Sequence, residues 1–147
     1  MTITDALISE HRAFTVVFAQ ADRLLEELHS TPEVHVLARL VMGLLHDHGD
    51  AEENLAFAAL DHLLAERGQL NRFYQEHQEV DLHFRQVLEA SRVGQAKALL
   101  SGALRATREH FAWEEAAVFP LLDEILQMGT LQQLGAARAQ RSLALPV

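Results

Sequence analysis

Apolar residues recur every three or four positions along most of the chain, which is the spacing of one face of an α-helix. Breaks at Ser30-Thr31-Pro32, Gly68 and Ser91-Arg92-Val93-Gly94 divide this pattern. The pattern therefore predicts helices over about 5–29, 32–66, 70–91 and 95–128. After Gly129 it weakens, and residues 131–144 are expected to form a short C-terminal helix or arm.

Four helices joined by short connections predict an all-α fold, an up-down-up-down four-helix bundle followed by that short helix or arm. The 147 residues are expected to form a single domain, with the bundle over about 5–128 and the tail over 129–147. The second helix continues 18 residues beyond His48, whereas His77 comes only seven residues after Leu70. At 1.5 Å per residue this is a mismatch of roughly 16 Å. We therefore expect the second helix to end near Asp61-His62, followed by an irregular link.

Pro120 falls inside the fourth predicted helix. Its ring clashes with the carbonyl group four residues back, at Ala116, and it has no N–H to donate. A kink or one released backbone hydrogen bond is therefore expected at this point.

Histidines stand on the apolar faces of all four predicted helices, at His11, His48, His77 and His110. Two of them are followed four residues later by Glu52 and Glu114, and residues four apart share one helix face. The chain also repeats internally. Glu-His-x6-Phe occurs at 10–18 and 76–84, and His-x3-Glu-Glu-x3-Phe occurs at 48–57 and 110–119. The first two helices thus echo the last two, which implies a pseudo-twofold axis.

Imidazoles and carboxylates in a core cost several kcal/mol per charged group unless something pairs with them. No Lys or Arg stands on these faces near the histidines, so a cation is the economical partner. The chain has no cysteine, and His with carboxylate suits iron, manganese or zinc. Ligands from four helices favour a dinuclear centre bridged by Glu52 and Glu114. A metal-free, hydrated polar core is the alternative.

Two common metal motifs are absent. No glutamate stands three residues before His11, His48, His77 or His110, which disfavours the ferritin-like class, and His-Glu-x-x-His does not occur. The formal charge of −9 argues against nucleic acid or an anionic membrane surface as a partner. No apolar run reaches 18 residues, and the first residues lack the features of a secretory signal, so a cytoplasmic location is expected.

The four histidines and the two His-x3-Glu-Glu-x3-Phe motifs follow one another in the order typical of the hemerythrin-like (HHE cation-binding) family, with a proline directly after the last phenylalanine. The chain resembles this family from residue 5 to about 128. The resemblance implies a four-helix bundle that holds two iron ions, bridged by carboxylates and an oxo or hydroxo group. Manganese or zinc are possible substitutes. It also implies binding of O2, nitric oxide or peroxide, or an enzymatic reaction with them. An iron-binding or iron- and oxygen-sensing module without turnover is the alternative.

Carried over by motif, the resemblance implies that the four histidines are terminal ligands and that Glu52 is one bridge. The other bridge is the carboxylate after His110. Hemerythrins proper place an acid five residues after that histidine, which would select Glu115, whereas the internal repeat selects Glu114. We prefer Glu114.

Further candidates surround this set. Hemerythrins proper carry a second histidine one turn after the third-helix histidine, and Asp81 stands there in this chain as a candidate ligand. Glu53 and Glu115 are expected to accept hydrogen bonds from ring N–H groups of the ligands. His62 returns to the helix face of His48 and is a candidate for lining the site.

Overall fold

The computed structural model describes residues 1–64 and 69–143, and within this part the chain is helical with no strand. The all-α prediction is confirmed. The long helices are α1 (Ile3–Glu27), α2 (Thr31–Ala51), α4 (Gln69–Glu89) and α5 (Val93–Trp113). The others are α3 (Ala58–Leu64), α6 (Phe119–Ile125) and α7 (Met128–Leu143), and the π-helical segments are η1 (Glu52–Phe57) and η3 (Glu114–Val118). No helix among these residues is long and apolar enough to cross a membrane.

Side-chain caps begin the first two helices. Thr2 accepts a hydrogen bond from the Asp5 backbone, and the Asp5 carboxylate accepts one from the Thr2 backbone, so the two residues form a capping box. The Ser30 side chain caps α2 by accepting a hydrogen bond from the Glu33 backbone. Pro32 lies in the first turn of this helix, where its missing N–H costs little.

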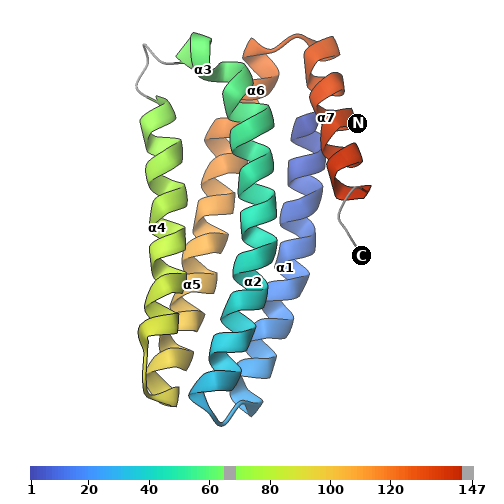
Figure 1. The fold of residues 1–147 in the computed structure, drawn as a ribbon. Coiled ribbons are helices and arrows are strands. Elements are labelled where there is room, and N and C mark those ends of the chain that lie inside the picture. Colours follow the sequence, from blue (N-terminus) through green and yellow to red (C-terminus); the bar gives the residue numbers. More distant parts are fainter. Residues whose placement is uncertain (65–68, 144–147) are drawn as a thin grey trace.

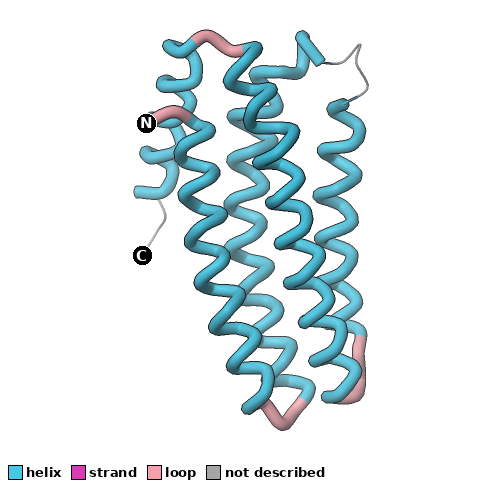
Figure 2. The backbone as a smooth tube through the Cα atoms, turned by 180° about the vertical axis from the view of Figure 1, so that it is seen from behind, coloured by secondary structure: helices cyan, strands magenta, loops and turns pink. Residues whose placement is uncertain are grey.

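The four long helices lie side by side, and each runs opposite to the one before it in the chain (Figure 1). Seen from behind, the loop after α1 and the loop after α4 lie at the same end of the molecule (Figure 2). The helix α7 turns back and packs against the outside of α1. The predicted C-terminal helix is therefore present and docked on the first helix.

Two apolar clusters fill the interior. One gathers Phe14, Phe18, Val41, Phe84, Leu100 and Phe111 with their neighbours. The other gathers Ile3, Leu7, Phe57, Phe73, Phe119 and Leu131 with theirs. Along α1, His11 falls between Leu7 of the second cluster and Phe14 of the first. The buried histidines therefore stand at the level where the two clusters meet.

A bend at η1 compensates for the unequal lengths of the second and third helices. The Ala58 N–H bonds to the carbonyl of Glu53, five residues back, and α3 turns away from the axis of α2 (Figure 1). Helical structure runs to Leu64, slightly beyond the predicted end near Asp61-His62. Most of the predicted link, residues 65–68, lies outside the described residues. After the bend, His77 reaches the level of the other histidines.

The expected disturbance at Pro120 is a π turn. Phe119, just before the proline, donates its N–H to Glu114, five residues back, and α6 then starts with the proline in its first turn. The equivalent π turn at η1 contains no proline, so the ring is not its only cause. Single π turns inside helices are frequent at functional sites, and here each begins at one of the candidate bridging glutamates.

Candidate metal centre

Six predicted ligands meet in the interior. Two groups of four side chains each place their ligand atoms within 4.8 Å of one another. The first group is His11, His48, Glu52 and Glu114, and the second is Glu52, His77, His110 and Glu114. The two glutamates belong to both groups. This is the arrangement expected of two neighbouring cation sites that share a pair of carboxylates.

The inner nitrogens of the rings point toward these carboxylates. Nε2 of His48 lies 2.8 Å from Oε1 of Glu52, and Nε2 of His77 lies 2.9 Å from Oε2 of the same side chain. Nε2 of His110 lies 2.7 Å from Oε1 of Glu114. Glu52 therefore contacts imidazoles from both halves of the internal repeat.

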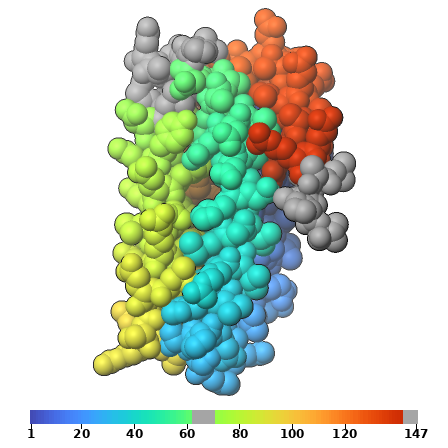
Figure 3. All heavy atoms as spheres, in the orientation of Figure 1, coloured from blue at the N-terminus to red at the C-terminus, as the bar shows by residue number. Residues whose placement is uncertain are grey.

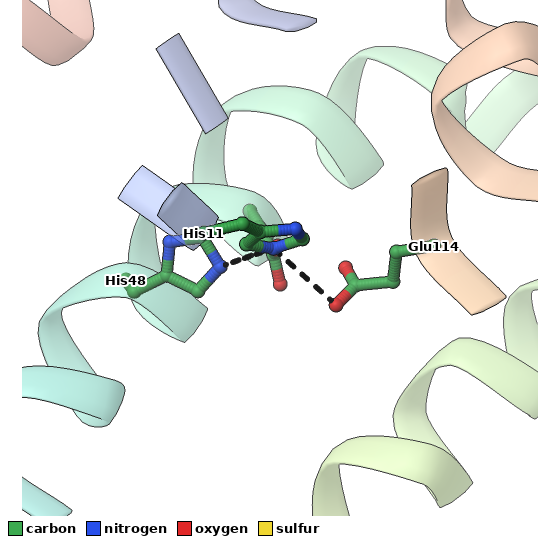
Figure 4. A group of neighbouring side chains, drawn as sticks. His11, His48 and Glu114 are labelled. Carbon is green, nitrogen blue, oxygen red and sulfur yellow. Dashed lines mark hydrogen bonds and ion pairs between the residues drawn. The ribbon is translucent and has the colours of Figure 1, made fainter. Parts of the chain in front are cut away.

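The ring of His11 lies between His48 and Glu114 (Figure 4). Its Nε2 lies 3.1 Å from Nε2 of His48 and 3.9 Å from Oε1 of Glu114. Two imidazole nitrogens and a carboxylate oxygen thus converge from three different segments, namely α1, α2 and η3. Such a cluster of lone pairs suits a cation.

The outer ring nitrogens of His11 and His77 are held by glutamates from the other half of the repeat. Nδ1 of His11 donates to Oε1 of Glu115 at 2.9 Å, and Nδ1 of His77 donates to Oε1 of Glu53 at 3.1 Å. These contacts fix each ring so that Nε2 points inward, as hydrogen bonds to metal-bound histidines commonly do. Both glutamates lie where the sequence places acceptors for ring N–H groups.

Glu76 holds His110 in the same way, and Glu10 lies beside His48 without a hydrogen bond to it, and the sequence reasoning missed both. Nδ1 of His110 donates to Oε2 of Glu76 at 3.4 Å, and Nδ1 of His48 lies 3.7 Å from Oε2 of Glu10. Arg138 of α7, which is buried, in turn donates to Glu10. The recurring Glu-His pair in the repeat is the signal that could have identified both glutamates.

Glu52 and Glu114 carry the clearest sign of a missing partner. All four of their carboxylate oxygens are buried and accept no hydrogen bond, and Nδ1 of His48 is likewise without a hydrogen-bond partner. Their short contacts to imidazoles lack hydrogen-bond geometry. Orphaned oxygens of this kind cost free energy unless a cation binds them. The nitrogen and oxygen donors, with no sulfur, fit iron, manganese or zinc.

The electrostatics of the cluster divide the two carboxylates. Burial raises the pKa of Glu52, but the neighbouring His48 and the other imidazoles outweigh it and lower that pKa well below its usual range. Burial and the charge of Glu52 raise the pKa of Glu114 to about 7. Burial opposes protonation of His48 and His77, yet the charge and contacts of Glu52 raise their pKa values to about 10 and about 9. The metal-free cluster therefore retains protons that a cation would displace.

Asp81 stands apart from the six-residue set. The carboxylate of Asp81 accepts from His46 at 3.2 Å and pairs with Arg85 at 2.7 Å, and it belongs to neither group of ligand atoms. The side chain of His62 lies outside the described residues.

A cavity of about 380 Å³ opens between α2 and α4 and reaches the centre, where His48, Glu52, His77 and His110 line it. Figure 3 shows the surface hollowed between these two helices. Met42, Leu45, Val80, Phe84 and Phe111 form an apolar part of its wall, and polar and charged residues line the rest, among them Asp50, Gln78 and Arg85. A small molecule therefore has a route from the surface to the cluster.

The comparisons with known proteins agree with this geometry. The model of the family described as hemerythrin HHE cation binding domain matches residues 2–122 of the chain. No curated protein and no solved structure gave a significant match. The chain belongs to the hemerythrin HHE cation-binding family, as its motifs indicated.

Proposed function

We propose that this protein holds a dinuclear non-haem iron centre and that it binds or reacts with O2, nitric oxide or peroxide. The observation that carries the proposal is the sharing of Glu52 and Glu114 by two groups of ligand atoms, with all four carboxylate oxygens lacking hydrogen-bond partners. Iron bound there would supply one-electron redox chemistry and Lewis acidity. Membership of a cation-binding family supports the same conclusion.

The protein's own residues have separable roles in this proposal. His11 and His48 would serve one ion, His77 and His110 the other, and Glu52 and Glu114 both. Each ion then has two imidazoles and two shared carboxylates, a set that resembles two-histidine carboxylate sites with positions left for a small ligand. Asp81 is left out of the set, because its carboxylate already pairs with Arg85.

Around the ligands, the fold has two further tasks. The glutamates on the outer nitrogens hold the rings in one tautomer, and the apolar clusters on either side limit the access of water along the bundle axis. We also propose that the four long helices form an up-down-up-down bundle. Their alternating directions in Figure 1 support this topology. The cytoplasmic location expected from the sequence remains a prediction.

Metal analysis tests the proposal directly. The protein, purified after expression in iron-supplemented medium, should contain about two iron ions per chain, and the ferric form should show carboxylate- or oxygen-to-iron absorption. A chain that binds no metal, and whose melting temperature ignores chelators, would end the proposal. The matched control is a variant with His46→Ala, since His46 is exposed and lies outside both groups.

Turnover separates this function from the alternative of an iron-binding or sensing module. The cavity that reaches His77 and His110 favours a centre open to small molecules. Repeated cycles of spectral change when peroxide or nitric oxide is added to the ferrous protein would support reaction. A single change without further turnover would support sensing.

A further inference from the structure

The two halves of the centre have equivalent ligands but different surroundings. In the internal repeat, Phe111 follows His110, whereas Gly49 follows the equivalent His48. The Phe111 ring stacks on the His11 ring, with centroids 3.9 Å apart and planes 13° from parallel. Gly49 occupies the equivalent position beside His77, since a Cβ added there would lie 3.8 Å from Nδ1 of that ring. Because glycine has no side chain, no ring stacks on His77 from this position.

A second large-to-small difference lies three residues after each first histidine of the repeat. Phe14 packs against the His48 ring edge-on, with centroids 5.4 Å apart, and contacts Phe111 at 5.5 Å. The equivalent residue in the other half is Val80, which forms part of the cavity wall. Two aromatic rings that close the first half thus have a glycine and a valine as counterparts in the second.

The missing rings coincide with the cavity. The side chain of His77 is 15% exposed, against 3% for its equivalent, His11. Within the part of the chain that the structure describes, the cavity is lined by Gly49, Val80 and His77 but not by His11. Its volume of about 380 Å³ lies within the range of small-molecule pockets and exceeds the roughly 30 Å³ of one water molecule more than tenfold.

We propose that exogenous ligands reach the centre from the side of His77 and His110, and that Gly49 and Val80 determine the size of the molecule that fits there. The ligand class is a small molecule with an oxygen or nitrogen donor at its head. The apolar part of the cavity wall also accepts a short hydrocarbon portion, so the site is not limited to diatomic molecules. This inference rests on the proposed metal centre.

The test restores the missing ring. Gly49→Phe and, separately, Val80→Phe are loaded with iron, and azide is titrated while the azide-to-iron absorption is followed. Gly43→Phe is the matched control, because Gly43 lies on the same helix and a Cβ at that position would meet no atom within 4 Å. Each cavity variant should keep two iron ions per chain and bind azide at least about tenfold more weakly, whereas the control should bind it normally.

A bulkier probe sharpens the result. Propionate should compete with azide in the wild type and lose this competition in Val80→Phe. Unchanged azide affinity in an iron-replete Gly49→Phe protein would overturn the inference. If that variant fails to bind iron, Val80→Phe decides in the same way. Absence of iron from the wild type would instead refute the proposed metal centre itself.

Discussion

Oε1 of Glu115 accepts a hydrogen bond from Nδ1 of His11 at 2.9 Å, on the side of the ring that faces away from the centre. Its neighbour Glu114 is fully buried, and Oε1 of Glu114 lies 2.7 Å from Nε2 of His110. Of the two adjacent glutamates, Glu114 therefore faces the centre and Glu115 faces away from it. The side chain of Glu115 is 43% exposed. The internal repeat, rather than the spacing of hemerythrins proper, places the inner carboxylate.

Glu114→Ala should lose most of the bound iron, whereas Glu115→Ala should retain it at saturating metal. Removing a partner of a ligand's outer nitrogen typically lowers metal affinity by about 10- to 100-fold, less than loss of a shared ligand. Iron per chain and a competitive chelator titration measure both effects. Glu53→Ala is the equivalent control, because Glu53 holds His77 in the same way. The reverse order for Glu114 and Glu115 would refute the assignment.

Metal removal should destabilise the fold. Because the cation binds the native cluster and not the unfolded chain, free metal at about 1,000 times its Kd contributes about 4 kcal/mol. For a chain of this size that corresponds to roughly 8–16 °C in melting temperature. Thermal unfolding with and without chelator gives the difference.

Without metal, replacing Glu114 by an apolar residue should not lower the melting temperature of the protein. Glu114→Leu removes a buried carboxyl group whose two oxygens accept no hydrogen bond, and burying a polar group without such a partner costs free energy. In chelator, this variant should melt at or above the wild-type temperature, and adding iron should leave it unchanged. A lower melting temperature in chelator would mean that the carboxyl group stabilises the fold without metal.

Metal binding should release protons, and its affinity should rise with pH. The pKa values of His48 and His77 are raised to about 10 and about 9, so both rings are protonated at pH 7.5 in the metal-free protein. Glu114, with a pKa of about 7, is partly protonated. Since ligands bind metal only when deprotonated, about two protons should leave per chain at pH 7.5. Calorimetry in buffers of different ionisation enthalpy counts them, and zero release would contradict the prediction.

The repeat and the helical spacing were sufficient to predict the helices and the level of the histidines. Because Glu52 comes four positions after His48, both side chains lie on one face of a helix. The breaks at Ser30 and Ser91 each precede a new helix in the structure, because capping and turn residues act locally. The limits of the single domain, predicted as 1–147, remain a prediction.

The π turns and the difference between the halves could not be read from the pattern. Whether a helix accommodates an extra residue after Glu52 depends on packing against other helices, and no proline marks that position. In the sequence, Gly49 indicates only a residue that weakens a helix. The structure places it beside His77 and in the wall of the cavity, which the sequence pattern does not predict. The contact of Arg138 with Glu10 joins residues 128 apart, beyond any local rule.

Gly135 should be required for the docking of α7. A Cβ there would lie 2.8 Å from the carbonyl carbon of Thr2 and against the carbonyl oxygen of Met1, both backbone atoms that cannot rotate away. Gly135→Ala should therefore lower the melting temperature, although alanine favours a helix by about 1 kcal/mol. Gly129→Ala, at an open position of the same helix, is the control and should be neutral or stabilising. Equal behaviour of both variants would exclude close packing as the reason.

Arg138 should connect α7 to the metal centre. Its Nε donates to Glu10 at 3.0 Å and its Nη2 to Asp47 at 2.8 Å, while Glu10 lies beside the outer nitrogen of His48. Hydrogen bonds to charged groups contribute about 1.5–3 kcal/mol each. Two such bonds would give about 3–6 kcal/mol, but Glu10 and Asp47 are partly exposed and are solvated once the arginine is lost. Arg138→Ala should therefore destabilise the protein by about 2–3 kcal/mol, measured by urea unfolding with iron bound.

Arg85→Ala is the control for Arg138→Ala, because it removes an arginine that does not contact Glu10 or α7. Arg85 is 68% exposed and pairs with Asp81 four residues earlier on α4, and such pairs contribute about 0.3–0.5 kcal/mol. A second readout tests the connection to the centre. Without Arg138, Glu10 is free to turn toward solvent, so Nδ1 of His48 loses the carboxylate beside it and iron affinity should fall by about tenfold. An unfolding change without any change in iron affinity would make Arg138 a purely structural residue.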